Sequence, residues 1–243
     1  MIPLLLSALL VVVGSAQSGA PQTGPGFSFG LPFEWHAEGS TDVWYLADNY
    51  PPGLDVVLVG DNGTWHAKTG TACKIEYGGQ GEVEATRLTG IEKSPPSADI
   101  AVVAAQAPSV RVVKPEEGRP FLTKEMEAQA EQLLDPTFTE LEEIGADTKS
   151  KRPAKVMRAG RALLLVYDVD RSFADGIPVL FLNGHVFKLG GLCTCDHLFF
   201  TVNGKLHLAY GVPSCNSGAF FVTVYDLSGT EPKHVYDNWA LGT

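Results

Sequence analysis

Short apolar or alternating stretches, separated by glycine, proline and asparagine, dominate the first half of the chain and predict β-strands. Residues 55–59 and 64–68 flank the turn Asp61-Asn62-Gly63, and Asn-Gly turns favour hairpins, so these two strands are expected to pair. Residues 27–115 are therefore predicted to form an N-terminal β region. Its expected strands are 43–46, 55–59, 64–68, 72–77, 82–88, 100–104 and 110–113.

Helical spacing of apolar residues occurs only in the middle of the chain, within residues 116–161. Asp135-Pro136 is typical of an N-cap followed by proline at the first helical position, which predicts two helices rather than one. Gly145 is the expected stop of the second helix. The apolar stripes are Leu122, Met126, Ala130 and Leu133 in the first helix, and Phe138, Leu141 and Ile144 in the second.

Charge divides this middle segment into an acidic and a basic part. Residues 116–148 carry ten acidic side chains against Arg119 and Lys124, whereas residues 149–161 carry six basic side chains and no acid. We expect a solvated connector whose basic end faces the acidic stretch. The alternative is that the basic block meets a membrane surface or a polyanion.

The last third of the chain again has a strand pattern, punctuated by the turns Asn183-Gly184 and Asn203-Gly204. Sequential hairpins of this kind predict an antiparallel meander over residues 162–243. The predicted fold is therefore mainly β, of the α+β class, with two antiparallel β regions joined by a short helical segment. The expected strands of the meander are 162–169, 178–182, 185–189, 196–202, 205–210, 219–226 and 233–236.

The N-terminus has the pattern of an export signal. An apolar run over residues 4–13 ends in Gly14-Ser15-Ala16, which is typical of a signal peptide cleaved after residue 16. Residues 17–26 would follow as a flexible leader, and the protein would be secreted or periplasmic, with no transmembrane segment expected. No Lys or Arg precedes the run, so a buried N-terminal helix or strand is the alternative.

Export makes disulfides the expected state of the four cysteines, Cys73, Cys193, Cys195 and Cys215. A two-residue turn at Asn203-Gly204 places Val202 opposite Lys205, and this register brings Cys215 near Cys193 and Cys195. The preferred pairing is Cys193–Cys215 with Cys73–Cys195. One alternative exchanges Cys193 and Cys195, and another pairs those two with each other in a small strained ring.

Two segments offer catalytic or metal chemistry instead. Cys193, Cys195 and His197 alternate and would share one face of a strand, where with Cys215 they could hold zinc or copper, or exchange thiols. Residues 163–172 end in Asp168-Val169-Asp170-Arg171-Ser172 and resemble the nucleophile motif of haloacid-dehalogenase phosphatases, which implies Asp168 as nucleophile and Asp170 as acid/base. That fold needs alternating strands and helices, and the pattern after residue 172 is one of strands alone.

Net charge and aromatic content narrow the function further. A formal charge of −10 argues against a nucleic-acid partner, since phosphate binding needs a clustered basic face. We expect an exported, non-catalytic binding or structural protein without cofactor or metal, whose ligand is an unidentified protein or glycan. The alternative is an extracytoplasmic hydrolase or thiol-redox enzyme built on Asp168/Asp170 or Cys193/Cys195. Aromatic residues that could line a glycan or peptide surface, or else belong to the core, are Trp35, Trp44, Tyr45, Trp65 and Trp239.

Overall fold

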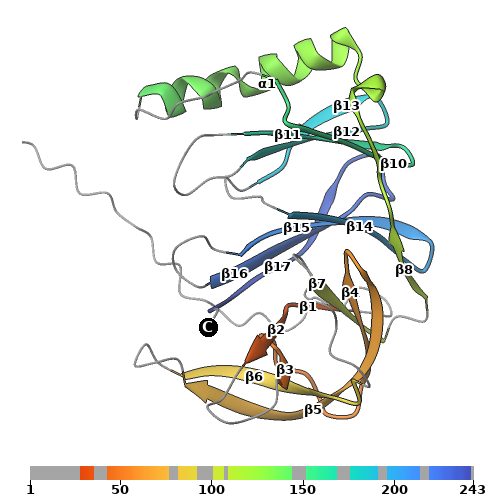
Figure 1. The fold of residues 1–243 in the computed structure, drawn as a ribbon, viewed down its shortest axis with the longest axis vertical. Helices are drawn as coiled ribbons and strands as arrows, with labels where there is room; N and C mark the ends of the chain where they lie inside the picture. Colours follow the sequence, from red (N-terminus) through yellow and green to blue (C-terminus); the bar gives the residue numbers. More distant parts are fainter. Residues whose placement is uncertain are drawn as a thin grey trace, which may run out of the picture.

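The computed structural model confirms a mainly β protein whose strands form antiparallel sheets, together with one α-helix. It describes residues 28–35, 43–76, 82–91, 101–106, 109–143, 152–168, 176–190, 196–213 and 219–241. The strands belong to three sheets, which we call the barrel sheet, the central sheet and the outer sheet. Figure 1 shows them stacked in that order, with the helix covering the outer sheet.

The element bounds follow in sheet order. The barrel sheet runs β1 (Ser28–Gly30), β7 (Ala101–Ala105), β4 (Asp55–Gly60), β5 (Gly63–Glu76), β6 (Glu82–Thr89), β3 (Val43–Leu46) and β2 (Pro32–Trp35). The central sheet runs β17 (Lys233–Leu241), β16 (Ala219–Asp226), β15 (Lys205–Pro213), β14 (Asp196–Val202) and β8 (Val110–Val113). The outer sheet runs β13 (His185–Lys188), β12 (Ile177–Leu182), β11 (Ala162–Tyr167), β10 (Lys155–Ala159) and β9 (Glu116–Glu117), and is followed outward by η1 (Arg119–Phe121) and α1 (Lys124–Glu143).

The barrel sheet closes on itself. Its two edge strands, β1 and β2, are consecutive in the chain and are separated by Leu31 alone. β1 pairs with β7 and β2 pairs with β3, while the Leu31 carbonyl accepts a hydrogen bond from the Ala47 amide at 2.9 Å. One continuous segment therefore joins both edges and closes the sheet, β1 pairing on one side of the segment and β2 on the other.

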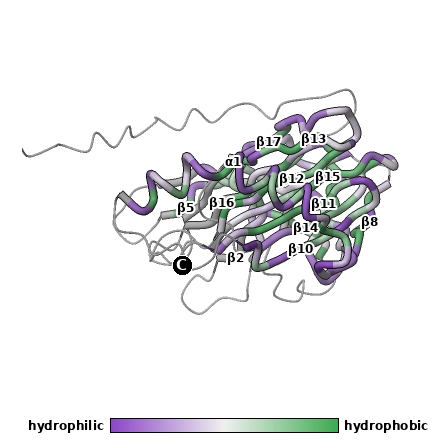
Figure 2. The backbone as a smooth tube through the Cα atoms, turned by 90° about the horizontal axis from the view of Figure 1, so that it is seen from above, coloured by the Kyte–Doolittle hydropathy of each residue, from purple (hydrophilic) through white to green (hydrophobic). Residues whose placement is uncertain are grey.

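Four hydrophobic cores hold the layers together. Among the described residues, the interior of the barrel is filled by residues of its own part of the chain, including Leu46, Val56 and Leu58. A second core joins the barrel to the central sheet, a third joins the central sheet to the outer sheet, and a fourth lies under α1. Figure 2 shows that hydrophobic residues follow the stacked strands, whereas α1 carries many hydrophilic residues.

The predicted hairpins are confirmed. β4 pairs with β5, β12 with β13, and β14 with β15, the last with Val202 opposite Lys205 as expected. Asn183 and Asn203 have φ of 54° and 53°, the left-handed conformation that Asn-Gly turns require. The meander expected over residues 162–243 is divided between two sheets: β11, β12 and β13 pair in sequence in the outer sheet, whereas β14 to β17 pair in sequence in the central sheet.

Two of the sheets combine strands from different predicted segments of the sequence. β8, from the N-terminal β region, pairs with β14 at the edge of the central sheet. β9 and β10 come from the segment expected to be a connector, and they extend the outer sheet beside β11. An alternating pattern shows which face of a strand is buried but does not name its neighbour, so these pairings follow from packing.

The expectation of two helices is wrong, because α1 runs unbroken from Lys124 to Glu143 with Pro136 inside it. An internal proline removes one helical hydrogen bond and costs about 3 kcal/mol. The single helix keeps Leu134, Phe138 and Leu141 on the same buried face against the outer sheet, and this burial outweighs the loss. No helix in the described part of the chain has the length and apolar character needed to cross a membrane.

Candidate functional site

Two tryptophans lie at the same end of the barrel. β3 and β5 each run antiparallel to β6, so they run parallel to each other. Trp44 is near the start of β3 and Trp65 near the start of β5, which places both at one mouth, where Ile91 also follows the end of β6. Mouths of β-barrels are common places for ligand sites.

Both tryptophans belong to the barrel interior and remain half-buried. Trp44 shares a face with Leu46, and Trp65 is paired with Leu58, and all four contribute to the interior core. The Trp65 ring borders the β4–β5 turn, since its nearest carbons lie 3.9 Å from where a Cβ of Gly63 would stand. This end of the barrel therefore carries two half-buried aromatic side chains that pack against its apolar interior core.

The indole Nε1 of Trp44 is buried, and no described residue accepts a hydrogen bond from it. A buried donor without a hydrogen-bond acceptor costs about 1–3 kcal/mol of stability, so native proteins have few of them. At a binding site, an atom of the ligand can supply the missing acceptor. Indole rings with one free donor suit a ring-shaped, uncharged ligand that carries oxygen acceptors. Sequence reasoning had named both residues as possible surface aromatics, but only the register places them together.

The side chain of Asp48 is the centre of a polar cluster in which both carboxylate oxygens already accept hydrogen bonds. Its Oδ2 accepts hydrogen bonds from the Leu31 amide at 3.1 Å and the Tyr236 hydroxyl at 2.8 Å, and its Oδ1 accepts one from Asn238 Nδ2 at 2.8 Å. Burial raises the pKa of Asp48, and these three hydrogen bonds oppose that effect. The carboxylate ties β17 to the barrel, which is a structural role. Sequence reasoning missed this cluster because its members are 190 and 188 residues apart.

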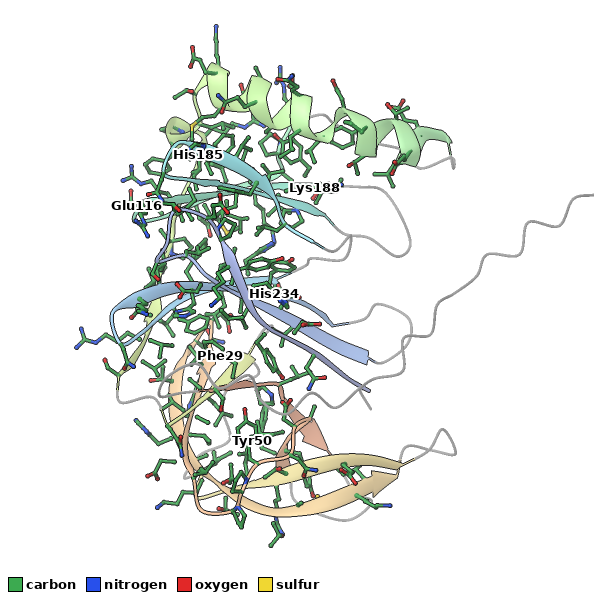
Figure 3. All side chains as sticks on the ribbon, turned by 180° about the vertical axis from the view of Figure 1, so that it is seen from behind. Phe29, Tyr50, Glu116, His185, Lys188 and His234 are labelled. Carbon is green, nitrogen blue, oxygen red and sulfur yellow. The ribbon has the colours of Figure 1, made fainter. Side chains whose placement is uncertain are left out.

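Tyr50 extends the same network into the barrel. Its hydroxyl donates to the Phe29 carbonyl, and its amide donates to Thr86 Oγ1 at 3.0 Å. Thr86 Oγ1 in turn donates to the Asp48 carbonyl at 2.7 Å. Figure 3 shows Tyr50 within the barrel and Phe29 near the central sheet. The whole cluster stabilises the closing segment of the barrel.

Two histidines of the central sheet lie on opposite faces, as the predicted register implies; His207 is buried and His197 is half-buried. His197 pairs with Tyr210 toward the outer sheet, and His207 pairs with Phe200 toward the barrel. Burial lowers the pKa of His197 to about 4, with a smaller contribution from Lys155. Burial also lowers the pKa of His207, while the nearby Asp226 carboxylate opposes it. Both imidazoles are therefore neutral at pH 7.

The sequence-predicted chemical residues are only partly within the described structure. Cys73 is the single cysteine there, and its free thiol donates to the Ala85 carbonyl at 3.5 Å, with a pKa raised by burial. Asp168 is exposed just after the end of β11. Cys193, Cys195, Cys215 and Asp170 lie outside the described residues, so the disulfides and the alternative sites built on them stay predictions. Within the described ranges, no three His, Cys, Asp or Glu side chains gather to hold a metal ion.

The basic residues of the middle segment make structural contacts. Arg158 forms two hydrogen bonds to the Glu116 carboxylate, at 3.1 and 3.0 Å, and stacks over the Phe121 ring at 4.2 Å. Arg161 Nη2 donates to carbonyls of the turn after β16, those of Leu227, Ser228 and Gly229. These contacts support the interpretation of the basic stretch as structural, in place of a surface for polyanions.

Comparisons with known proteins identify no relative of this chain. The chain matches no protein-family model, and neither curated protein sequences nor solved structures contain a significant match to it.

Proposed function

We propose that this chain is an exported, non-catalytic binding protein that holds a glycan at the mouth of its barrel. The observation that carries the proposal is the buried indole N–H of Trp44, for which no described residue is an acceptor, at the mouth that Trp65 also borders. Sugar rings stack their C–H faces on indole surfaces, and their hydroxyl oxygens accept hydrogen bonds, so a glycan meets both needs.

The polar clusters of the described residues support binding over catalysis. Asp48 is the half-buried carboxylate with a raised pKa, and both of its oxygens already accept hydrogen bonds from groups that tie the layers together. A general acid or base must reach a substrate proton, and these contacts occupy the positions from which Asp48 would do so.

Export is part of the proposal and rests on residues 1–16 alone. Secreted protein whose N-terminal peptide begins at Gln17 would support it, and an intact Met1 peptide in exported material would contradict it. The proposed disulfides, Cys193–Cys215 and Cys73–Cys195, are tested by peptide mapping without reduction; the second would replace the contact of the Cys73 thiol with the Ala85 carbonyl. Four alkylatable thiols in unreduced exported protein would rule them out.

Binding is tested by tryptophan fluorescence during titration with soluble cello-, xylo- and chito-oligosaccharides. Trp44→Phe keeps one aromatic ring but removes the five-membered ring together with its N–H. Affinity should therefore fall by about fivefold or more, since the lost neutral hydrogen bond alone contributes about 1 kcal/mol. Trp65→Ala removes a stacking surface and should weaken binding by about tenfold or more.

His66→Ala is the matched control, because His66 is adjacent to Trp65 on β5 but exposed on the opposite face of the strand. It should bind like the unaltered protein. The proposal fails if no oligosaccharide changes the fluorescence, or if Trp44→Phe and Trp65→Ala bind as tightly as His66→Ala.

A further inference from the structure

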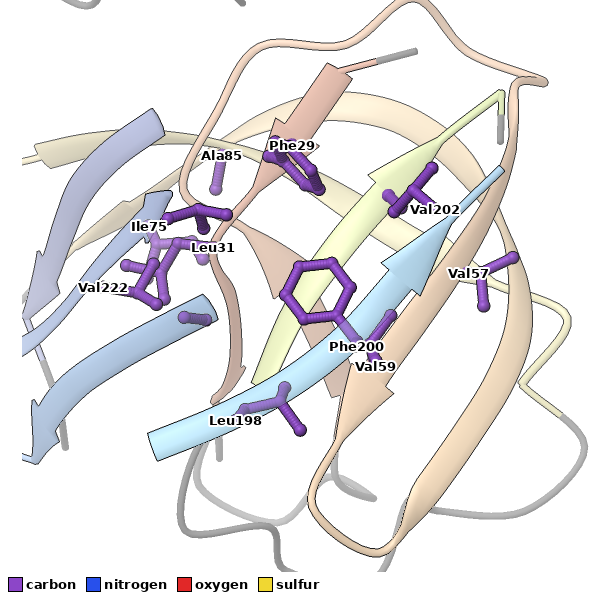
Figure 4. Close-up of a cluster of buried hydrophobic side chains, with 13 residues drawn as sticks. Phe29, Leu31, Val57, Val59, Ile75, Ala85, Leu198, Phe200, Val202 and Val222 are labelled. Atoms are coloured by element: carbon purple, nitrogen blue, oxygen red, sulfur yellow. The ribbon is translucent and has the colours of Figure 1, made fainter. Parts of the chain in front are cut away.

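The core under α1 contains a buried hydroxyl group without a hydrogen-bond partner. Figure 4 shows, for contrast, the core between the barrel and the central sheet, where every labelled side chain is apolar. Under α1, Tyr167 of β11 is 0% exposed, and no described residue forms a hydrogen bond with its hydroxyl. Its ring makes a T-shaped contact with the ring of Phe138, with the centroids 6.1 Å apart. The phenol therefore lies between the outer sheet and the helix.

Two glutamates of α1 precede Phe138 on the same side of the helix. With 3.6 residues per turn, Glu127 and Glu131 both fall within the stripe that also contains Phe138. Thr137 lies at one border of this stripe, where its hydroxyl accepts a hydrogen bond from Lys188 of β13. Glu131 lies at the other border, which is turned away from β13 and toward the middle of the outer sheet.

Both glutamates act on the Tyr167 hydroxyl. Burial raises the pKa of Tyr167 to about 12, with smaller contributions from the negative charges of Glu131 and Glu127. The phenol is therefore neutral at pH 7. Glu127 is half-buried and Glu131 is exposed, so the two carboxylates connect the buried hydroxyl to solvent. Neither carboxylate forms an ion pair with a described residue.

This arrangement destabilises the fold in two ways. A buried hydroxyl without a partner lowers stability, and so do like charges four residues apart on a helix. A bound cation that carries N–H groups would offset both effects, because it neutralises the carboxylates and donates to the phenol oxygen. A primary ammonium has three N–H donors, one for each carboxylate and one for the phenol. Its alkyl chain would contact the apolar side chains under α1.

A metal ion fits these groups less well than an ammonium does. Mg²⁺ and Ca²⁺ take several carboxylate, carbonyl or water oxygens, and here the third protein group is a neutral phenol. Within the described ranges, no third His, Cys, Asp or Glu side chain joins Glu127 and Glu131 to hold a metal ion. Ammonium groups are also attracted to aromatic rings, which Tyr167 and Phe138 supply.

We propose that the contact between α1 and β11 is a binding site for the primary ammonium group of a small alkylamine, held by Glu127, Glu131 and Tyr167. The site lies at the outer sheet, so it is independent of the glycan site proposed at the mouth of the barrel. An amine bound there links the helix to a strand, and it should therefore fasten α1 to the outer sheet.

Binding is tested by thermal unfolding of the full chain and by calorimetric titration at pH 7 and constant ionic strength, with n-butylamine and diaminobutane as probes. Tm should rise by about 5–10 °C at about 100 times the dissociation constant, because the amine binds the folded state alone. Tetramethylammonium has no N–H group and should bind at least about tenfold more weakly. The proposal is overturned if neither amine binds, if tetramethylammonium binds equally well, or if Mg²⁺ or Ca²⁺ binds more tightly.

Conservative substitutions locate the site. Glu127→Gln and Glu131→Gln each remove one charge-assisted hydrogen bond and should weaken amine binding by about tenfold. Tyr167→Phe removes only the hydroxyl and should also weaken binding. Glu140→Gln is the matched control, because Glu140 is an exposed glutamate on a different side of the same helix. Amine binding that is equal in the control and in the other three variants would refute the site.

Tyr167→Phe gives a second test that needs no ligand. Since the hydroxyl is buried without a partner, its removal should leave Tm unchanged or raise it in the absence of amine. The same variant should gain less than the unaltered protein when amine is added. A fall in Tm of more than about 3 °C without amine would mean that the hydroxyl already has a partner, such as a buried water, and would overturn the proposal.

Discussion

Tyr236→Phe is the sharpest test of the contact between β17 and the barrel, because it removes one oxygen atom. The Tyr236 hydroxyl donates to Asp48 Oδ2 at 2.8 Å, across 188 residues of sequence. A hydrogen bond to a charged group contributes about 1.5–3 kcal/mol to stability. Tyr236 is half-buried, so the lower part of that range applies. The ring contact with Phe29 remains in the variant.

We therefore expect Tyr236→Phe to lower the free energy of unfolding by about 1.5 kcal/mol, or Tm by about 3–6 °C for a chain of this size. Urea denaturation followed by circular dichroism measures the midpoint and the m-value, and the m-value should not change. A double-mutant cycle with Asp48→Asn isolates the pair, and its coupling energy should be about 0.5 kcal/mol or more.

The reasoning is refuted if Tyr236→Phe changes stability by less than about 0.3 kcal/mol and the coupling energy is zero within error. In that case the hydroxyl would not bond Asp48 in solution, and Asn238 alone would hold β17 to this carboxylate.

Three further changes test other parts of the fold. Leu134→Ala, at a fully buried position of α1, should cost about 2–5 kcal/mol in urea denaturation, whereas Gln132→Ala on the exposed face should cost less than about 0.5 kcal/mol; equal losses would contradict the packing of α1. Gly30→Ala places a Cβ 3.1 Å from Tyr50 Oη and 3.3 Å from Asp48 Oδ2, so a loss of about 1–3 kcal/mol is expected, and a neutral result would mean that the closing segment does not approach Tyr50. The pKa of His197 is lowered to about 4 in the folded state. The free energy of unfolding should therefore be highest above pH 6.5 and fall by up to about 3 kcal/mol toward pH 4. His197→Gln should remove this part of the loss of stability in acid.

Much of the local structure could be predicted from residue patterns. The pairs β12–β13 and β14–β15 were predicted from alternating strands around Asn-Gly, and the positive φ of Asn183 and Asn203 explains why those residues occur there. The opposite orientation of His197 and His207 also followed from the register of a two-residue turn. Such features are set by backbone geometry over a few residues, which the sequence contains directly.

The candidate site was only partly predictable. Trp44 and Trp65 could be named as exposed aromatics, but their common mouth depends on β3 and β5 both pairing with β6. The Asp48 cluster could not be found, because an aspartate between two strands gives no sign of a tyrosine and an asparagine near the other end of the chain. Long-range polar contacts of this kind leave no periodic signal.

The sequence by itself determined that the chain forms β-strands, where its hairpins turn, and which face of each strand is apolar, because these depend on alternation and on turn residues. The tertiary structure decided which strands share a sheet, that β1 and β2 close a barrel, and that α1 continues through Pro136. The physical reason is that these choices depend on the total apolar surface buried between layers, which outweighs local preferences such as a proline's tendency to begin a helix.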